Sequence, residues 1–262
     1  MQIKITNREY MHDLLNKGAR EFGRNFLDYR SIKLEVNKMP HAEGSALVDI
    51  GNTKVLAGVK LAVGDPQHDR YGEGSLMTSA ELLPLASGRY ETGPPTPDAV
   101  EFARVVDRGI RAADIIDTEA LFIDEENVWN VFVDIYVLNY DGNLFDAGTL
   151  SAVAALLTSK QPRYEDEVVI RDGKLPRIKI KGGAVTSCTY GKIGGRLLLD
   201  PDGNEEDLMS ARLTIANDEH HLRAMQKGLS GEFSLEEVEK AIDTTFERSK
   251  ELRKIVEKAI GE

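Results

Sequence analysis

The sequence predicts an α+β fold built from two similar lobes, and three observations lead to it. Strands with alternating apolar and polar residues come in groups rather than one by one between helices. Two-residue hairpin signals stand at Gly51-Asn52 and Gly194-Gly195. Each half then ends in a long helical pattern, so strands precede the closing helix twice.

The first expected element is a helix over residues 7–17. Thr6 and Glu9 have the spacing of a capping box, and Gly18 can end the helix. Its apolar stripe consists of Tyr10, Met11, Leu14 and Leu15. The charged stretch that follows, residues 18–30, is expected to be a linker and contains Arg20, Arg24 and Arg30.

A group of strands follows the linker. Alternation predicts one strand at residues 32–36, and the hairpin signal joins two more at residues 46–50 and 54–63. Residues 64–74 then read as a loop, and residues 75–85 as a further strand. These elements form the strand-rich part of the first lobe.

Two helices and a long strand complete the first lobe. Three prolines between positions 94 and 97 delay regular structure until Asp98, which opens a helix to about residue 114. Residues 128–140 form a long strand whose two faces are both fairly apolar, so we expect it to be buried on both sides. After a turn at 141–143, residues 146–159 form a helix of small residues suited to close packing on a sheet.

The polar, proline-containing stretch 161–167 is the expected boundary, which gives lobes of residues 1–160 and 161–262. In the second lobe, hairpins are expected at Asp172-Gly173 and at Gly194-Gly195. A capping box formed by Ser234 and Glu237 begins a last helix, which runs to about residue 259. Further strands are expected at residues 185–190, 196–199, 213–216 and 222–226.

Bulk composition restricts the class of protein. The net charge of −11 disfavours a protein that coats nucleic acid over its whole surface. The longest apolar run, residues 152–157, is too short to span a bilayer, and the first residues lack a signal-peptide core. A lone Cys188 fits a reducing compartment. We therefore expect a cytoplasmic protein that does not bind a membrane.

Three arginines lie on one face of the helix that begins at Asp98. Arg104, Arg108 and Arg111 are spaced i, i+4, i+7, so their guanidinium groups form a stripe. Such a stripe can attract phosphate groups in an otherwise acidic chain. The alternative is an ordinary ion-paired surface, because Glu101 and Asp107 stand nearby.

No complete catalytic site emerges from the residues themselves. The acidic segment 200–207 could hold a divalent cation, or it could be a solvated turn that leads into a helix N-terminus. His220 and His221 are adjacent and would point to opposite faces of a strand. Cys188 lies in an apolar-polar strand with no base beside it in the sequence, so we expect a packed cysteine.

Several segments, in order, resemble the ribonuclease PH family over nearly the whole chain. The resemblance lies in the arginine-bearing linker, the hairpin 48–57, Gly93-Pro94-Pro95 with residues 101–108, residues 133–143 with 146–150, and the acidic segment 200–207. In particular, the chain resembles the non-catalytic ribonuclease PH-like subunit of the archaeal exosome. The resemblance implies a ribonuclease PH-like fold, whose N-terminal lobe is like the second domain of ribosomal protein S5.

The chain departs from the catalytic members that it resembles. Those members carry an arginine pair where this helix begins with Thr96-Pro97-Asp98. They also carry a phosphate loop ending in arginine where residues 141–149 here place an acid. An added carboxylate opposes phosphate binding, so we expect no catalytic residues. Asp200 and Asp207 lie near the family's metal-binding places, but an extra residue between them speaks against a metal pair, and we expect no cofactor.

The resemblance also implies partners. A catalytic ribonuclease PH-like paralogue would join this chain in a hexameric ring, a trimer of heterodimers, with a trimeric cap of RNA-binding proteins. Arg104 and Arg108 match positions at which the non-catalytic subunit contacts single-stranded RNA, and Arg111 joins them on geometry alone. The alternative is a self-sufficient phosphate-dependent 3′–5′ exoribonuclease. A lobed domain like those of small-molecule kinases is a third possibility, which lacks its glycine-rich phosphate loop.

Overall fold

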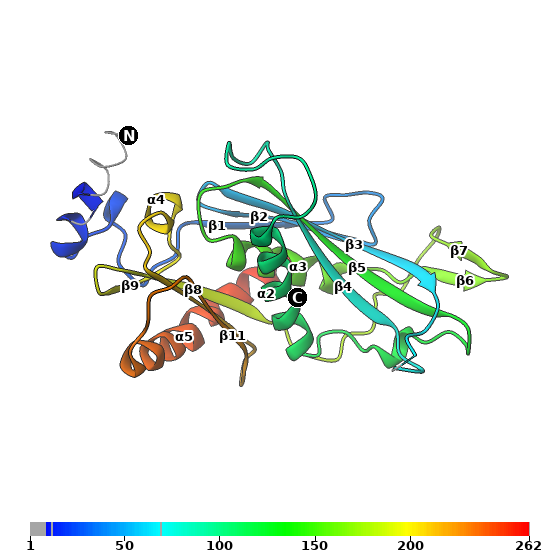
Figure 1. Cartoon of the computed structure of the whole chain (residues 1–262). Coiled ribbons are helices and arrows are strands. Elements are labelled where there is room, and N and C mark those ends of the chain that lie inside the picture. The colour runs from blue at the N-terminus through cyan, green and yellow to red at the C-terminus, as the bar shows by residue number, and fades with distance from the viewer. Residues whose placement is uncertain (1–8, 12, 69, 262) are drawn as a thin grey trace.

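The computed structural model describes residues 9–11, 13–68 and 70–261. It contains a five-stranded sheet in the order β1-β2-β3-β5-β4 and a four-stranded sheet in the order β11-β10-β8-β9 (Figure 1). Helices α2, α3 and α5 pack against these sheets. The architecture is the expected α+β fold with strands ahead of a closing helix in each half.

The N-terminal sheet follows the predicted hairpin. Strands β1 (Ile32–Val36), β2 (Gly44–Ile50) and β3 (Thr53–Gly64) are antiparallel, and Ile50 faces Thr53 across the two-residue turn. Gly51 in that turn has a φ of +57°, a conformation in which glycine avoids a steric penalty. The long strand β5 (Val128–Asn139) pairs with β3, and the hairpin prediction is confirmed.

One connection in this sheet is parallel. Strand β4 (Ser75–Leu82) pairs in parallel with β5, and helix α2 (Pro97–Ala112) lies between them in the chain. In the resulting βαβ unit, α2 packs on β4 and also on helix α3 (Leu144–Thr158). This crossover decides on which face of the sheet the arginine helix lies.

Helix α3 (Leu144–Thr158) is the centre of the molecule. It contacts β2 and β3 of one sheet, β8 of the other, and the helices α2 and α5. All but one of its residues are buried. Its small residues permit this: a Cβ added at Gly148 would overlap the ring of Phe102. The predicted close-packing role of this helix is confirmed.

The C-terminal sheet also follows its turn signals. Strands β8 (Thr186–Ile193) and β9 (Arg196–Leu199) turn at Gly194-Gly195, while β10 (Ala211–Asn217) pairs with both β8 and β11 (Leu222–Gly228). Helix α5 (Leu235–Ile260) begins at the predicted capping box of Ser234 and Glu237. Both sheets contribute to one hydrophobic core, so the lobe boundary at 160/161 stays a prediction.

Two local expectations are wrong. The hairpin expected at Asp172-Gly173 lies instead between β6 (Arg163–Glu165) and β7 (Val168–Ile170). Its turn residues Asp166 and Glu167 both adopt positive φ, which is the geometry of a type I′ turn without the usual glycine. Strand β5 alternates between fully buried and half-buried residues, because the described chain covers only one face of its sheet.

The N-terminal segment agrees with expectation where it is described. Residues 9–11 and 13–16 are helical, Gly18 has a φ of +78°, and the capping residue Thr6 lies outside the described residues. The linker continues through a short 3-10 turn, η1 (Glu21–Gly23). Another 3-10 turn, η2 (Glu119–Leu121), follows α2, and α4 (Gly203–Glu206) lies in the acidic segment. None of the helices in the described ranges is both long and apolar enough to cross a membrane.

Candidate functional site

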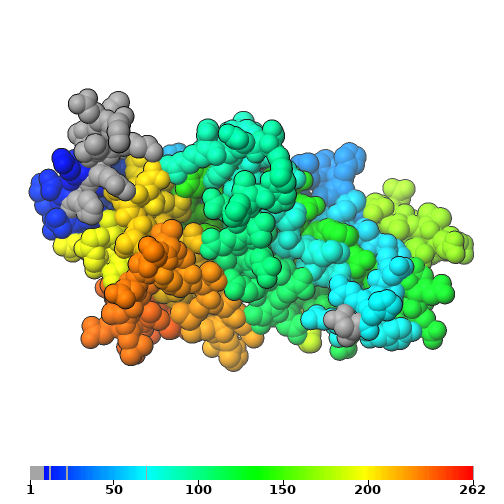
Figure 2. All heavy atoms as spheres, in the orientation of Figure 1, coloured from blue at the N-terminus to red at the C-terminus, as the bar shows by residue number. Residues whose placement is uncertain are grey.

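Helix α2 presents the arginine stripe on its outer face. Thr96 caps the helix by accepting a hydrogen bond from the backbone of Ala99, and Pro97 occupies its first turn. The apolar side of the helix faces the core through Phe102, Val106 and Ile110. The opposite side therefore carries the arginines, Arg104, Arg108 and Arg111, all of which are exposed. In Figure 2, α2 lies at the front of the molecule, beside β11.

The three arginines differ in how they are held. Arg111 donates to Asp107 Oδ2 at 2.7 Å and to the carbonyl of Leu76. Arg108 donates to the neutral Oε1 of Gln226 on β11 at 2.5 Å. None of the described residues accepts a hydrogen bond from Arg104 or forms an ion pair with it.

The acids beside the stripe are engaged elsewhere. Glu101 pairs with Arg212 of β10 at 2.6 Å, and Asp107 accepts from Thr78 as well as from Arg111. The ion-paired alternative therefore describes Arg111, whereas Arg104 and Arg108 keep their positive charge without a carboxylate partner in the described chain.

The acidic segment 200–207 forms a helix entry, but it is not solvated. Asp202 caps α4 and shares a complete capping box with Glu205. The expectation of a solvated turn is wrong, because Asp200 and Glu205 are both fully buried. A buried carboxylate requires a paired charge or several hydrogen bonds.

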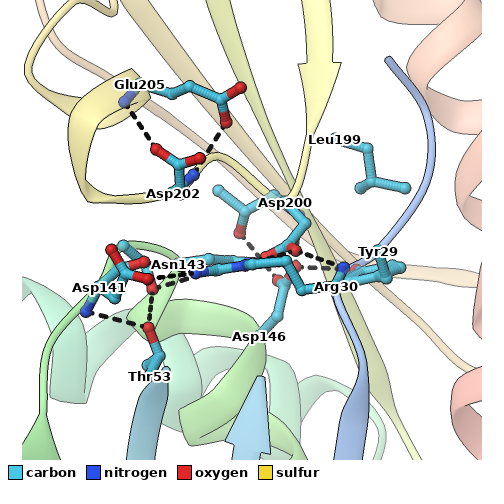
Figure 3. A network of polar contacts seen from close by, with 12 residues as sticks. Tyr29, Arg30, Thr53, Asp141, Asn143, Asp146, Leu199, Asp200, Asp202 and Glu205 are labelled. Carbon is cyan, nitrogen blue, oxygen red and sulfur yellow. Dashed lines mark hydrogen bonds and ion pairs between the residues drawn. The ribbon is translucent and has the colours of Figure 1, made fainter. Parts of the chain in front are cut away.

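Three arginines of the N-terminal linker supply that charge (Figure 3 shows Arg30 and its surroundings). Arg20 donates from Nε and Nη2 to the two oxygens of Glu205, at 2.8 and 2.5 Å. Arg30 grips Asp200 in the same bidentate way, at 2.9 and 2.8 Å, and Arg24 reaches Asp200 at 2.7 Å. We call Arg20, Arg24, Arg30, Asp200, Asp202 and Glu205 the linker network.

Electrostatics in the linker network favour an ionised Asp200. Burial opposes the charge on Asp200, but the hydrogen bonds and the charge of Arg30 outweigh it and keep the pKa of Asp200 below its ordinary value. Arg30 also donates to the carbonyl of Asp141, so it joins the turn before α3 to the end of β9. Asp207, at the end of the segment, pairs with Arg89 at 2.7 Å. Within the described ranges, no three side chains of His, Cys, Asp or Glu are grouped to hold a metal ion.

A buried acid, Asp146, lies beside the turn where the resemblance places a phosphate loop. Asn143 adopts a positive φ of 53° and leads into α3, whose first turn carries Asp146. Asp146 is fully buried, and its carboxylate accepts from the linker residue Tyr29, from Asn143, and from β8. Burial raises the pKa of Asp146 to about 6, although the hydrogen bonds from Asn143 and Tyr29 oppose that rise.

The other side chains considered for chemistry have structural positions. Cys188 is fully buried on β8, and burial raises the pKa of its thiol, which suits a packed cysteine. His220 and His221 lie in the turn before β11 rather than on the strand, and their backbone N–H groups donate to Asp218.

The chain matches known proteins along most of its length. The model of the 3′ exoribonuclease family, domain 1, matches residues 28–162, and that of domain 2 matches residues 183–248. The exosome complex component Rrp42 of Thermococcus gammatolerans is 44% identical over 260 residues, which cover 97% of this chain and 95% of that protein. Its counterpart from Methanosarcina acetivorans is 43% identical over 253 residues, covering 96% and 93%.

Two solved structures are similar throughout. A chain of the Archaeoglobus fulgidus exosome with RNA bound to the active site has a TM-score of 0.91 and 36% identity, covering 97% of this chain and 99% of that one. A chain of an archaeal exosome core has a TM-score of 0.87 and 34% identity, covering 98% and 100%.

Replacing Arg20 with alanine should destabilise the fold strongly. Both side chains of the Arg20–Glu205 pair are 0% exposed, so the change leaves a buried carboxylate for which Arg24 is the one remaining cation among the described residues. Removing one partner of a buried pair costs about 3 to 5 kcal/mol of folding stability. Because Arg24 still pairs with Glu205, we expect a loss near the lower end of that range. The measurement is guanidinium unfolding at constant pH.

The matched control is Arg163→Ala, whose pair with Glu165 is 54% exposed on both sides. Its free energy of unfolding should change by less than about 1 kcal/mol. Equal destabilisation of the two variants would contradict the structural role of the linker network.

Asp146 should make stability fall with rising pH. Its pKa of about 6 exceeds the ordinary value of 3.8, so the folded state holds this proton more tightly than the unfolded state does. The stabilisation is therefore complete below about pH 4 and is lost as the pH rises through about 6, by about 3 kcal/mol. Asp146→Asn removes this dependence, so the stability difference between native chain and variant should shift by most of that amount between pH 4 and 7. A difference that stays constant over this range would refute the assignment.

Proposed function

Since the chain belongs to the 3′ exoribonuclease family, which includes ribonuclease PH, we propose that it is the non-catalytic ribonuclease PH-like subunit of an archaeal exosome. In this role it supports RNA degradation by a 3′–5′ exoribonuclease complex without performing the chemistry. The similarity to Rrp42 components and to exosome chains over nearly the full length supports this proposal.

One observation carries the non-catalytic part: the groups that would bind phosphate or metal are already neutralised inside the chain. Asp200 is held by Arg30 and Arg24, and the turn before α3 is filled by Asp146. Phosphorolysis needs positive charge that converges on an open phosphate position. The arginines that could supply it here, Arg24 and Arg30, are bound to carboxylates of the chain itself.

The proposed partner is a catalytic ribonuclease PH-like paralogue, in a hexameric ring built as a trimer of heterodimers. A trimeric cap of RNA-binding proteins would sit on this ring, and the assembly would be cytoplasmic. Stable ring contacts need more than about 1,000 Å² each. The uncovered face of the N-terminal sheet offers apolar area for one of them, through Leu56, Met77, Phe132, Tyr136 and Leu138.

The proposed direct function is to bind single-stranded RNA with α2. Arg104 and Arg108 have no carboxylate partner in the described chain and can therefore contact backbone phosphates. Arg111 completes the stripe with a guanidinium that Asp107 already holds. Holding the RNA in register beside the paralogue's active site would raise its rate by positioning.

The second candidate is a self-sufficient phosphate-dependent 3′–5′ exoribonuclease. It would need an unorthodox phosphate site, and the donors that converge beside the turn before α3 are already bound to Asp146. The two candidates differ in whether the isolated chain turns over RNA.

In the assembled ring, Arg104→Ala with Arg108→Ala should weaken RNA binding. The slope of log affinity against log salt should fall by about 1.4. On a single strand, each lost contact between an arginine and a backbone phosphate lowers this slope by roughly 0.7. Arg111→Ala is the matched control on the same helix and should change the slope much less, because Asp107 and Leu76 hold that side chain. If the double variant keeps the native affinity and slope, α2 is not the RNA-binding surface.

Catalysis should require the paralogue. The chain is purified alone and together with a catalytic paralogue, and release of nucleoside diphosphate from single-stranded RNA is measured at millimolar phosphate. We expect turnover only in the mixture, along with the mass of a ring. Robust phosphate-dependent turnover by the isolated chain would establish the exoribonuclease alternative instead.

A further inference from the structure

The Asp146 carboxylate accepts a complete set of hydrogen bonds from the chain itself. Its Oδ2 accepts from Tyr29 Oη at 2.8 Å, Asn143 Nδ2 at 2.9 Å and the Thr189 backbone N–H at 2.9 Å. Its Oδ1 accepts from Ser187 Oγ at 3.0 Å and Thr189 Oγ1 at 2.8 Å. We call these five donors the Asp146 cradle. They come from the linker, from the turn before α3 and from β8.

Every donor in the Asp146 cradle is neutral. Within the described chain, no arginine or lysine forms an ion pair with Asp146, although the side chain is fully buried. Burial opposes its negative charge, and hydrogen bonds and the N-terminal end of α3, a 15-residue helix, offset part of that cost. Such an arrangement of neutral N–H and O–H groups is how proteins bind small oxyanions in a dry interior.

Contacts that do not involve Asp146 hold the cradle in place. Asn143 donates its second amide hydrogen to Asp200 Oδ1 at 2.7 Å, and Arg30 fixes Asp200 in turn. Thr189 lies in β8, paired with Thr214 of β10 through the ladder and through their hydroxyls at 3.0 Å. The donors should therefore remain convergent when the carboxylate is removed.

We propose that Asp146 is the resident anion of a closed oxyanion-binding site, and that its carboxylate keeps inorganic phosphate and other small oxyanions out of the turn before α3. The site binds a planar carboxylate, supplied by the chain instead of by the solvent. Where the catalytic members have a phosphate site, this chain would then have an anion site that its own carboxylate fills. This inference extends the non-catalytic role proposed above, on which its biological meaning rests.

The test removes the resident anion and supplies a free one. Asp146→Ala deletes the three carboxyl atoms, which is the heavy-atom content of formate. At pH 7.5, formate at 100 times its dissociation constant should raise the melting temperature of this full-length variant by about 5 to 10 °C. Acetate and phosphate are larger and should act more weakly, and the native chain should respond to none of these anions beyond the general effect of chloride at equal ionic strength.

Two variants serve as controls. Asp146→Asn keeps the volume of the side chain and leaves no space for formate, so formate should not stabilise it. Asp134→Ala deletes a half-buried carboxylate on the uncovered sheet face and should respond to formate as the native chain does. If Asp146→Ala does not fold alone, the yield of folded chain on refolding with formate, compared with chloride, gives the same comparison.

Saturable rescue of Asp146→Ala by formate, absent in both controls, supports the resident anion. An equal response in all variants overturns it and leaves Asp146 a packing residue only. Neither RNA nor a paralogue enters these measurements, so a negative result here leaves the ring assignment intact. Conversely, failure of the ring assignment would not affect the anion site.

Discussion

The structure depends on the pairing of buried charge between the N-terminal linker and the acidic segment. Asp200 and Glu205 are fully buried, and a carboxylate in that position is strongly destabilising unless a cation meets it. Arg20, Arg24 and Arg30 therefore fix the path of the linker from the first helix to β1. Because Arg30 also binds Asp141, the same interaction sets the position of the turn from which α3 begins.

Helix α3 in turn positions the elements that pack against it. It lies between the two sheets with almost no exposed surface, and small residues allow α2 and β2 to approach it closely. Phe102 of α2 packs against Gly148, so the position of α2 follows from that of α3. The outward face of α2, which carries Arg104 and Arg108, is thus set by core packing, which is the kind of rigid support that a positioning surface needs.

Prediction from sequence succeeded where the determining interactions are local. The helix cap at Ser234 and the turns at Gly51-Asn52 and Gly194-Gly195 depend on neighbouring residues, and the structure has all of them. It failed at the acidic segment, because Asp200 meets Arg30 across 170 residues of sequence. It also failed for β5, since an apolar residue pattern does not reveal whether a layer covers the second face of a sheet. For the arginine stripe, periodicity predicted the shared face, but only the fold shows that Glu101 turns to Arg212.

The contrast between the two sets of arginines connects the fold to the proposed function. In the linker network, positive charge is cancelled within the chain and stabilises the structure. On α2, Arg104 and Arg108 retain their charge in a protein whose net charge is −11, so their positive field is local. A polyanion would then be attracted to one helix rather than to the whole protein. That distribution suits a subunit that holds RNA at a defined place while a neighbour supplies the phosphate site, because a chain with both sets exposed would bind RNA in many registers.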